Sequence, residues 1–173
     1  MESTLPYYVY ALRLLTRKSD AELRTASDLK KRKADGSKRR VGVLSASAAQ
    51  RWAEEELGDA VEVVVYDGNT DSMAETQNEK LDACVQDSPI ASFYAPRFPG
   101  LHVIDEPFAE GYYVMFAPKG ETAFVRALNE ALVGMLRSGE LERIQKKYGI
   151  WDARQARLLS IAEGGRFFGL SSA

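Results

Sequence analysis

The sequence predicts an α/β fold built around a parallel sheet. Three short runs rich in apolar residues, Arg40 to Leu44, Val61 to Tyr66 and Leu81 to Gln86, alternate with segments of helical character. This alternation predicts parallel strands with helices on both faces of the sheet. The length of 173 residues, with 45% apolar and 28% charged residues, is typical of a globular protein with one domain or two small lobes.

The elements before the first parallel strand are a strand, a short helix and a basic loop. Tyr8 to Thr16 is an apolar and aromatic run that predicts a strand, and a short helix is expected around Ala26 to Leu29. The segment Lys30 to Arg40 holds seven basic residues and one acid, with Asp35-Gly36 as a turn signal. We therefore expect this segment to be an exposed, solvated insertion.

Three helices are expected between and after the parallel strands. Ser47–Leu57 reads as the first helix, with Gln50 at the capping-box position. The second follows an Asp-Gly-Asn turn and covers about Thr70–Glu79. The third begins with Ser88 as the N-cap and Pro89 at the first helical position.

The C-terminal third predicts short strands followed by helices. Strands are expected at His102–Ile104 and Tyr112–Ala117. A stripe of apolar residues at a spacing of four then predicts a long helix that Gly139 interrupts: Phe124, Leu128, Leu132 and Leu136. A second helix follows as far as Gly149, and a last one covers Asp152–Ala162 and stops at Gly164-Gly165.

Charge and composition argue against several classes of function. The net charge of −2 and the pI near 5.6 give no global reason to expect nucleic acid as a partner. Cys84 is the single cysteine and His102 the single histidine, so we expect no internal disulfide, no metal site and no nucleophilic Cys-His pair. No run is long enough for a membrane span, and the N-terminus does not read as a signal peptide. We expect no cofactor.

Asp87 stands where the third parallel strand gives way to a helix. In sheets of this kind, ligands bind beyond the carboxyl ends of the strands, where helix N-termini also lie. Helix N-termini favour anions, and an aspartate beside them favours a cation such as an ammonium group. Together they suit a zwitterion. The alternative is that Asp87 is an ordinary turn or cap residue.

An ordered series of motifs resembles a known family, the type 3 extracellular solute-binding proteins, which are amino-acid receptors of ABC importers. The resemblance covers roughly Leu5 to Trp151 and rests on RVGVLSASAAQRW, VVVYDGNTDSM, KLDACVQDSPIASF, EPFAEGYYVMFAPKG and VRALNEALVGMLRSGELERIQKKYGIW, with LPYYVYALRLLTRKS at the start. The resemblance implies two α/β lobes that are joined by two crossover strands and close on the ligand. It implies a non-enzymatic binding module.

The resemblance also implies a domain organisation for this chain. Residues 1–10 are expected to be a remnant of the first lobe, and residues 11–117 the second lobe with both hinge crossovers. Residues 118–151 are expected to return to the first lobe as packing helices. Residues 152–173 would form a C-terminal extension, or a linker to a permease fused behind the domain.

The resemblance assigns roles to five residues. Asp87 matches the family aspartate that accepts hydrogen bonds from the ligand α-ammonium, while Ser47 and Ala48 match the helix N-terminus that holds the α-carboxylate. Ala46 stands where the family has glycine, and Ala48 lacks the hydroxyl expected there. Tyr8 fits the surface between the lobes.

The chain lacks most of the first lobe that the resemblance implies. Only Met1 to Thr4 precede the proline-tyrosine-tyrosine segment. A truncated chain, an incomplete pocket and an exposed apolar face that favours self-association are therefore expected. The implied partners are an amino acid and an ABC permease, and the implied location is periplasmic or extracytoplasmic, at the membrane through the transporter.

Other functional classes stay open. The family includes a dehydratase branch, but an enzyme needs a general acid or base in the cleft, and none stands out. A receiver domain would use Asp87 as a phosphoacceptor, yet Ser-Ala-Ser follows Arg40 to Leu44 where an acidic pair is needed. A degenerate scaffold without ligand is a further alternative.

Overall fold

The helices and strands of the computed structural model, which describes residues 1–164, group into two units. The central unit comprises Ala11–Glu110, and the terminal unit joins Met1–Tyr10 to the chain from Gly111 onward. Both boundaries fall within strands, β2 (Tyr8–Arg17) and β7 (Phe108–Tyr113), so two strands run through both units. The assignment of these units to the lobes of a larger binding protein stays a prediction.

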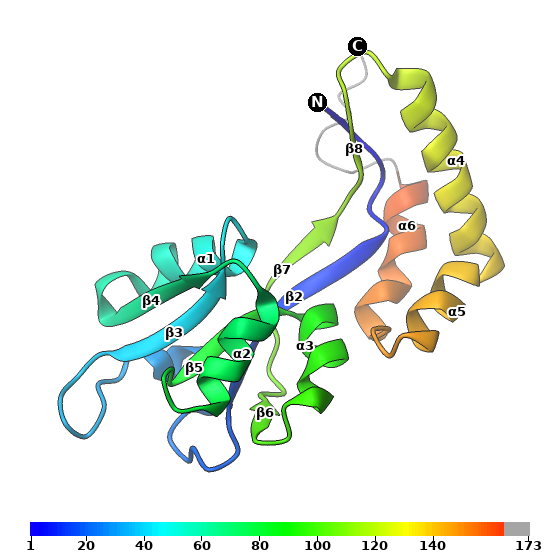
Figure 1. Cartoon of the computed structure of the whole chain (residues 1–173). Coiled ribbons are helices and arrows are strands. Elements are labelled where there is room, and N and C mark those ends of the chain that lie inside the picture. Colours follow the sequence, from blue (N-terminus) through cyan, green and yellow to red (C-terminus); the bar gives the residue numbers. More distant parts are fainter. Residues whose placement is uncertain (165–173) are drawn as a thin grey trace. The chain divides into compact units, whose positions relative to one another are not determined.

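The central unit is built on a mixed sheet with the strand order β4-β3-β5-β2-β6, and β7 also pairs with β2. Its three parallel strands are β3 (Arg39–Leu44), β4 (Val61–Tyr66) and β5 (Ala83–Asp87). The α/β class is confirmed, but the sheet is only partly parallel. Strand β2 runs antiparallel to both β5 and β6 (Leu101–Val103), because the chain enters it from the carboxyl edge of the parallel strands (Figure 1).

Three α-helices follow the parallel strands: α1 (Ala48–Trp52), α2 (Asn69–Gln77) and α3 (Ser88–Tyr94). The second half of the first expected helix is π-helical: α1 continues as the segment η2 (Ala53–Leu57). Gly58 ends this segment with φ +48°. The N-cap expected at Ser88 is also wrong. Asp87 is the N-cap residue of α3, which places Ser88 and Pro89 in its first turn.

The core of the central unit lies between the sheet and helices α2 and α3. Leu15, Met73, Cys84, Ala91 and Leu101 form one buried cluster there. Burial raises the pKa of the Cys84 thiol to about 11, so the thiol stays protonated and inert at neutral pH. This confirms the interpretation of Cys84 as a core residue.

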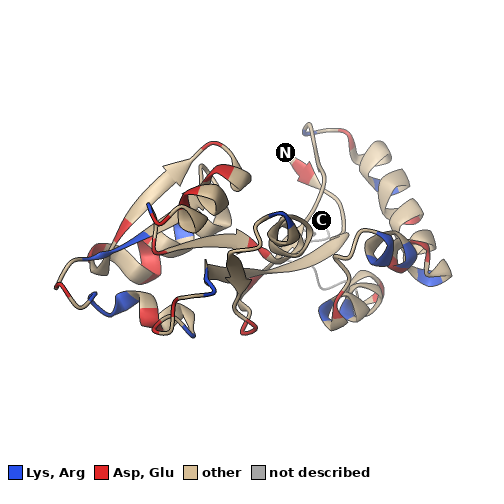
Figure 2. Ribbon diagram, turned by 60° about the horizontal axis from the view of Figure 1, so that its bottom comes forward, with Lys and Arg blue, Asp and Glu red and all other residues tan. Residues whose placement is uncertain are grey.

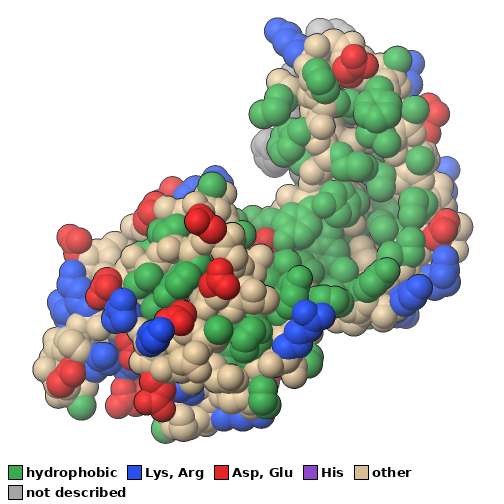
Figure 3. Space-filling model, in the orientation of Figure 1, with side chains coloured by type: hydrophobic (Ala, Val, Ile, Leu, Met, Phe, Trp, Pro, Cys, Tyr) green, Lys and Arg blue, Asp and Glu red, His purple; other side chains and the backbone are tan. Residues whose placement is uncertain are grey.

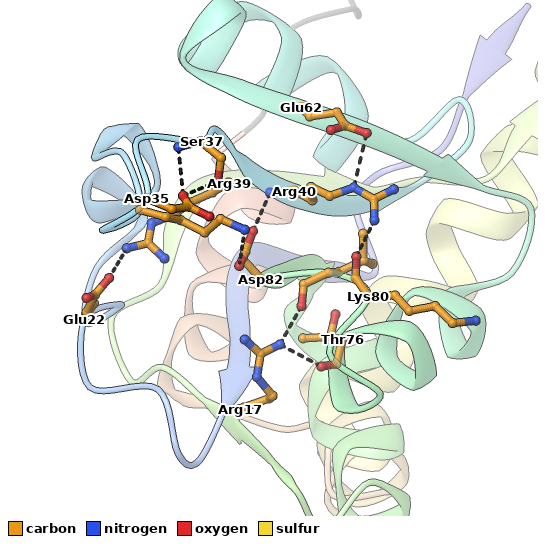
Figure 4. A network of polar contacts seen from close by, with 12 residues as sticks. Arg17, Glu22, Asp35, Ser37, Arg39, Arg40, Glu62, Thr76, Lys80 and Asp82 are labelled. Atoms are coloured by element: carbon orange, nitrogen blue, oxygen red, sulfur yellow. Dashed lines mark hydrogen bonds and ion pairs between the residues drawn. The ribbon is translucent and has the colours of Figure 1, made fainter.

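The basic segment Lys30 to Arg40 is only partly the solvated insertion that the sequence predicts. Its last two residues belong to β3, and Arg39 is buried with a guanidinium that pairs with Glu22 (Figure 4). The carboxylate of Asp82 accepts the Arg40 backbone N–H at 2.7 Å and lies 3.6 Å from Lys33 Nζ. Figure 2 shows both Lys and Arg and Asp and Glu on the ribbon of the central unit. Ion pairing ties the segment to the sheet.

The terminal unit is helical, with one very short two-stranded ribbon formed by β1 (Glu2–Ser3) and β8 (Phe116–Ala117). The elements that follow the ribbon are α4 (Thr122–Ser138), α5 (Glu140–Lys147), the 3-10 turn η5 (Ala153–Arg157) and α6 (Leu158–Glu163). Gly139 ends α4 with φ +73°, as its place in the sequence predicts. Gly164 caps α6, and Gly165, with the rest of the expected extension, lies outside the described residues.

Buried amides fix the ends of the chain within the terminal unit. The side chain of Gln155 accepts the Val9 N–H at 3.0 Å and donates to the Val9 carbonyl at 2.8 Å. Asn129 on α4 accepts the Leu5 N–H at 2.7 Å. Among residues 1–164, no helix combines the length and apolar character required to cross a bilayer.

Candidate functional site

The carboxyl ends of β3, β4 and β5 lie at the same edge of the central sheet, because the three strands are parallel. The Ser45 N–H donates to the Tyr66 carbonyl at 2.7 Å, which joins the chain after β3 to the end of β4. In the pairing of β3 with β5, Gly42 faces Cys84. Ser45 directly follows β3, and Asp87 is the last residue of β5. Both residues therefore lie at this edge of the sheet.

Ser47 shapes the loop that leads into α1. Its hydroxyl donates to the Leu44 carbonyl at 2.7 Å and accepts the Gln50 N–H at 3.1 Å. Ser47 is therefore the N-cap residue, one residue before Ala48. The first N–H groups of a helix have no acceptor within the helix, and those of α1 follow shortly after the carboxyl end of β3.

Ala46 adopts a backbone conformation that favours glycine. Its φ of +53° lies in the left-handed region, where a Cβ atom costs roughly 1–2 kcal/mol. The Ala46 N–H donates to Gln50 Oε1 at 2.8 Å, and Gln50 Nε2 donates to Glu54 at 2.8 Å. Sequence reasoning placed Gln50 at a capping position, but it missed that the Gln50 amide binds Ala46. The glutamine holds the strained turn and occupies one backbone donor of the loop.

Asp87 ends β5 and is half-buried, with its backbone paired to Leu12 on β2. No hydrogen bond of the N-cap type forms between its carboxylate and the first turn of α3. The residues on either side are buried and bonded: Gln86 Nε2 donates to Ser72 Oγ at 2.8 Å, and Ser88 Oγ accepts the Ala11 N–H at 3.3 Å. The carboxylate is thus carried on a backbone that is fixed on both sides.

Tyr8 belongs to the terminal unit, not to the central unit that carries these residues. It is buried, its hydroxyl donates to the Ile150 carbonyl, and its ring stacks on Tyr113 with centroids 5.8 Å apart. These contacts account for Tyr8 as a packing residue. Its role as a ligand contact stays a prediction.

This edge of the sheet therefore offers a carboxylate beside the start of a helix. A carboxylate accepts hydrogen bonds from an ammonium group, and helix N–H groups donate to an anion. The described residues contain no cluster of three or more His, Cys, Asp or Glu that could hold a metal ion. Ala46, Ser47 and Ala48 follow β3 and lie at the same edge of the sheet as Asp87. Their roles in ligand binding stay predictions.

Comparison with known proteins identifies the family. The family model "Bacterial extracellular solute-binding proteins, family 3" matches residues 1–150. The chain belongs to this family. The motifs that suggested the resemblance are therefore family features, and the α/β solute-binding fold follows from the membership.

Individual relatives of the chain bind amino acids according to their names. A probable histidine-binding protein from Neisseria gonorrhoeae is 28% identical over 160 residues, which cover 90% of this chain and 57% of the relative. The chain spans just over half of that relative's length.

Solved structures of amino-acid-binding proteins have a similar fold. The arginine-, lysine-, histidine-binding protein ArtJ from Geobacillus stearothermophilus has a TM-score of 0.75 and 26% identity, over 91% of this chain and 66% of its own. An ancestral amino acid-binding protein, a precursor of cyclohexadienyl dehydratase, has a TM-score of 0.74 with 22% identity, over 85% of this chain and 61% of its own. The second comparison shows the fold alone.

Proposed function

We propose that this chain is part of an amino-acid-binding module for an ABC importer. The observation that carries the proposal is the family match over residues 1–150 together with Asp87 at the carboxyl edge of the parallel strands. The named relatives that bind histidine or arginine support an amino acid as the ligand class. The chain covers 57% of its histidine-binding relative, so the transport role belongs to this proposal as well.

In this proposal, Asp87 accepts hydrogen bonds from the α-ammonium group of a polar amino acid. The ligand α-carboxylate binds at the start of α1, where Ser47 fixes the loop and Ala48 opens the helix. The charges of ligand and protein then pair with one another, which offsets the cost of removing them from water.

Two alanines set this chain apart from the pattern of its family. Ala48 offers a backbone N–H but no hydroxyl, so one side-chain donor is missing. The Ala46 N–H is bonded to Gln50 Oε1 at 2.8 Å, so it becomes a ligand donor only after the glutamine amide turns away. Both features predict weaker carboxylate binding than a hydroxyl at residue 48 would give.

The proposed activity is binding without catalysis. The residues that gather at the Asp87 edge are an aspartate, small residues and backbone donors, and a dehydratase would need an acid or base in addition. The family is extracellular by description, which supports a periplasmic or extracytoplasmic location and a permease as the partner. Fusion to that permease through the C-terminal extension and self-association through the terminal unit belong to the same proposal.

The experiment that tests the proposal is isothermal titration calorimetry of the full chain. The panel consists of arginine, lysine, histidine, glutamine and glutamate, each compared with its amide at the α-carboxyl group. The proposal expects saturable binding of at least one amino acid and weaker binding of its amide, because the amide lacks the anion. Heat changes that do not saturate for any member would overturn binding by this chain.

A further inference from the structure

A cavity lies on the central unit, between the C-terminal half of α3 and the edge strand β6. The cavity has a volume of about 480 Å³ and is lined mostly by apolar residues, among them Phe98, Pro99 and Leu101. Its polar lining includes Lys18 and His102. Small-molecule sites typically have volumes of about 300–1,000 Å³ and few polar groups. This cavity has the size and composition of such a site.

Hydrogen bonds hold the wall of the cavity in place. The Lys18 N–H donates to the Gly100 carbonyl at 2.9 Å, and the Gly100 N–H donates to Gln77 Oε1 at 3.0 Å. The Leu101 N–H donates to the Phe98 carbonyl at 2.9 Å, while the Leu101 side chain belongs to the buried core cluster. These hydrogen bonds anchor the backbone between Phe98 and Leu101, which forms part of the cavity wall.

The charge of the cavity is positive. Within the described part of the chain, Lys18 and His102 are among the lining residues and no Asp or Glu is. Lys18 is exposed and forms no ion pair with any described residue. The neighbouring Arg97 does not line the cavity, because its guanidinium lies over the rings of Phe93 and Tyr94. One lysine charge at the rim of an apolar hollow favours an anion with an apolar body.

The cavity is distant from the amino-acid edge of the sheet. On β2, Leu12 pairs with Asp87 and Arg17 pairs with Leu101. The five residue steps from 12 to 17 span about 17 Å of extended strand. An amino acid held at Asp87 does not reach the cavity.

We propose that this cavity is a second ligand site, which binds small carboxylates that carry a compact apolar group. The apolar group enters the hollow against Phe98 and Leu101, and the carboxylate lies at the Lys18 ammonium. The site is open to solvent, so the charge pairing is screened and the affinity is modest. We expect a dissociation constant on the order of 1 mM for a ligand of about ten heavy atoms.

The test is a titration of the ¹⁵N-labelled full chain with phenylacetate, followed by two-dimensional NMR. Saturable shifts are expected for the amides of Ala91, Leu101 and His102. Phenylacetamide, which is neutral and nearly the same shape, should bind about 3-fold more weakly, the effect expected for one exposed charge pair. No saturable shift of these amides at any accessible concentration would overturn the proposal.

Two variants separate charge from shape. Lys18→Met should bring phenylacetate binding down to that of phenylacetamide, whereas Lys38→Met, an exposed lysine outside the cavity, should leave it unchanged. Ser92→Phe fills the cavity from an exposed position and should abolish the shifts. Equal binding by the Lys18 variant and the unaltered chain would contradict the role of the lysine. If Asp87→Asn also lost phenylacetate binding, the cavity would not be a site separate from Asp87.

Discussion

The central and terminal units differ in how completely each covers its apolar side chains. In the central unit the strands β2, β3 and β5 are almost fully buried, and Leu15 is 0% exposed. In the terminal unit Phe116 is 67% and Phe124 56% exposed, and Figure 3 shows apolar side chains gathered over its surface. The central unit contains a sheet on which its helices pack. The described residues of the terminal unit include a short two-stranded ribbon and the ends of β2 and β7, but no comparable sheet.

This difference explains where folding stability should reside. Phe124 lies on α4 on the same face as Leu128 and Ala131, at a spacing of four and three residues, while Val125 and Leu132 are the residues of the helix that are buried. The apolar arc of α4 is therefore wider than the surface that covers it. The residues proposed to bind the ligand charges lie on the central unit, which is the better packed of the two.

The largest expected effect comes from core truncation in each unit. Leu15→Ala should lower the free energy of unfolding by about 4 kcal/mol, and Leu132→Ala by about 2 kcal/mol, because Leu132 is 7% exposed at the border of the uncovered face. Urea unfolding of the two variants measures both values. A loss for Leu132→Ala that equals the loss for Leu15→Ala would show that the terminal unit is as tightly packed as the central one.

A smaller effect is expected from Asp28, which takes part in the capping box of the 3-10 helix η1 (Ala26–Lys30). Its carboxylate bonds to Lys31 Nζ at 2.7 Å and to the N–H groups of Arg24 and Thr25 at 3.0 and 2.9 Å. The Lys31 ammonium and these donors hold the pKa of Asp28 well below its usual range. Asp28→Asn should lower the free energy of unfolding by about 1 kcal/mol at pH 7, as loss of a capping carboxylate does.

The pH dependence of this effect has a definite sign. The folded pKa is lowered, so the contribution of Asp28 is present above the unfolded pKa of about 3.9 and is lost as the pH falls through that value toward the folded pKa. Thermal unfolding at pH 7 and pH 2 measures the change, with the exposed Asp59→Asn as control. A difference between Asp28→Asn and the unaltered chain that is the same at both pH values would contradict the ionic account.

Ala46 provides a test of strain at the proposed ligand edge. Ala46→Gly should raise the free energy of unfolding by about 0.5 kcal/mol, because glycine accepts a positive φ but loses more entropy on folding. Ala48→Gly is the matched control, since residue 48 is helical, and it should lower the free energy of unfolding by about 0.5–1 kcal/mol. Both values come from denaturant titration. If Ala46→Gly also destabilises, the turn is not strained.

The smallest effect on folding is expected at Phe124. Phe124→Ser should change the free energy of unfolding by less than about 0.5 kcal/mol, because the side chain is mostly exposed. It should nevertheless weaken any self-association of the chain, measured by sedimentation velocity over a range of concentrations. Phe93→Ser, an exposed aromatic on the central unit, is the control. If both variants associate as strongly as the unaltered chain, the apolar face of the terminal unit is not the cause of self-association.

Much of the fold was predictable because each parallel strand is a short apolar run bounded by turn residues. Strands β3, β4 and β5 and helices α2 and α4 lie within two residues of their expected bounds. The direction of β2 was not predictable from local pattern, because an apolar run is the same in either direction and pairing is decided by distant residues. The burial of Arg39 was also missed, since its partner Glu22 is 17 residues away.

The candidate site was predictable in position more than in detail. Strand-end logic placed Asp87 and Ser47 at one edge, where the structure has them. The positive φ of Ala46 and its hydrogen bond to Gln50 were not predictable, because alanine, unlike glycine, does not indicate a left-handed backbone conformation. The cavity at Lys18 was not foreseen at all, because Lys18 is distant in the chain from the other lining residues, which lie between Ala91 and Val103.

The central claim, that Asp87 receives the ligand ammonium, is tested most directly by calorimetry of Asp87→Asn with the amino acid that binds best. The account predicts that Asp87→Asn lowers the affinity by a factor of at least roughly 30, as removal of one charge from a paired site does. It also predicts that Asp87→Asn binds a ligand without the α-amino group no more weakly than it binds the amino acid. Asp67→Asn, an exposed carboxylate after β4 at the same edge, should bind as the unaltered chain does. Equal affinity of Asp87→Asn and the unaltered chain would contradict the account.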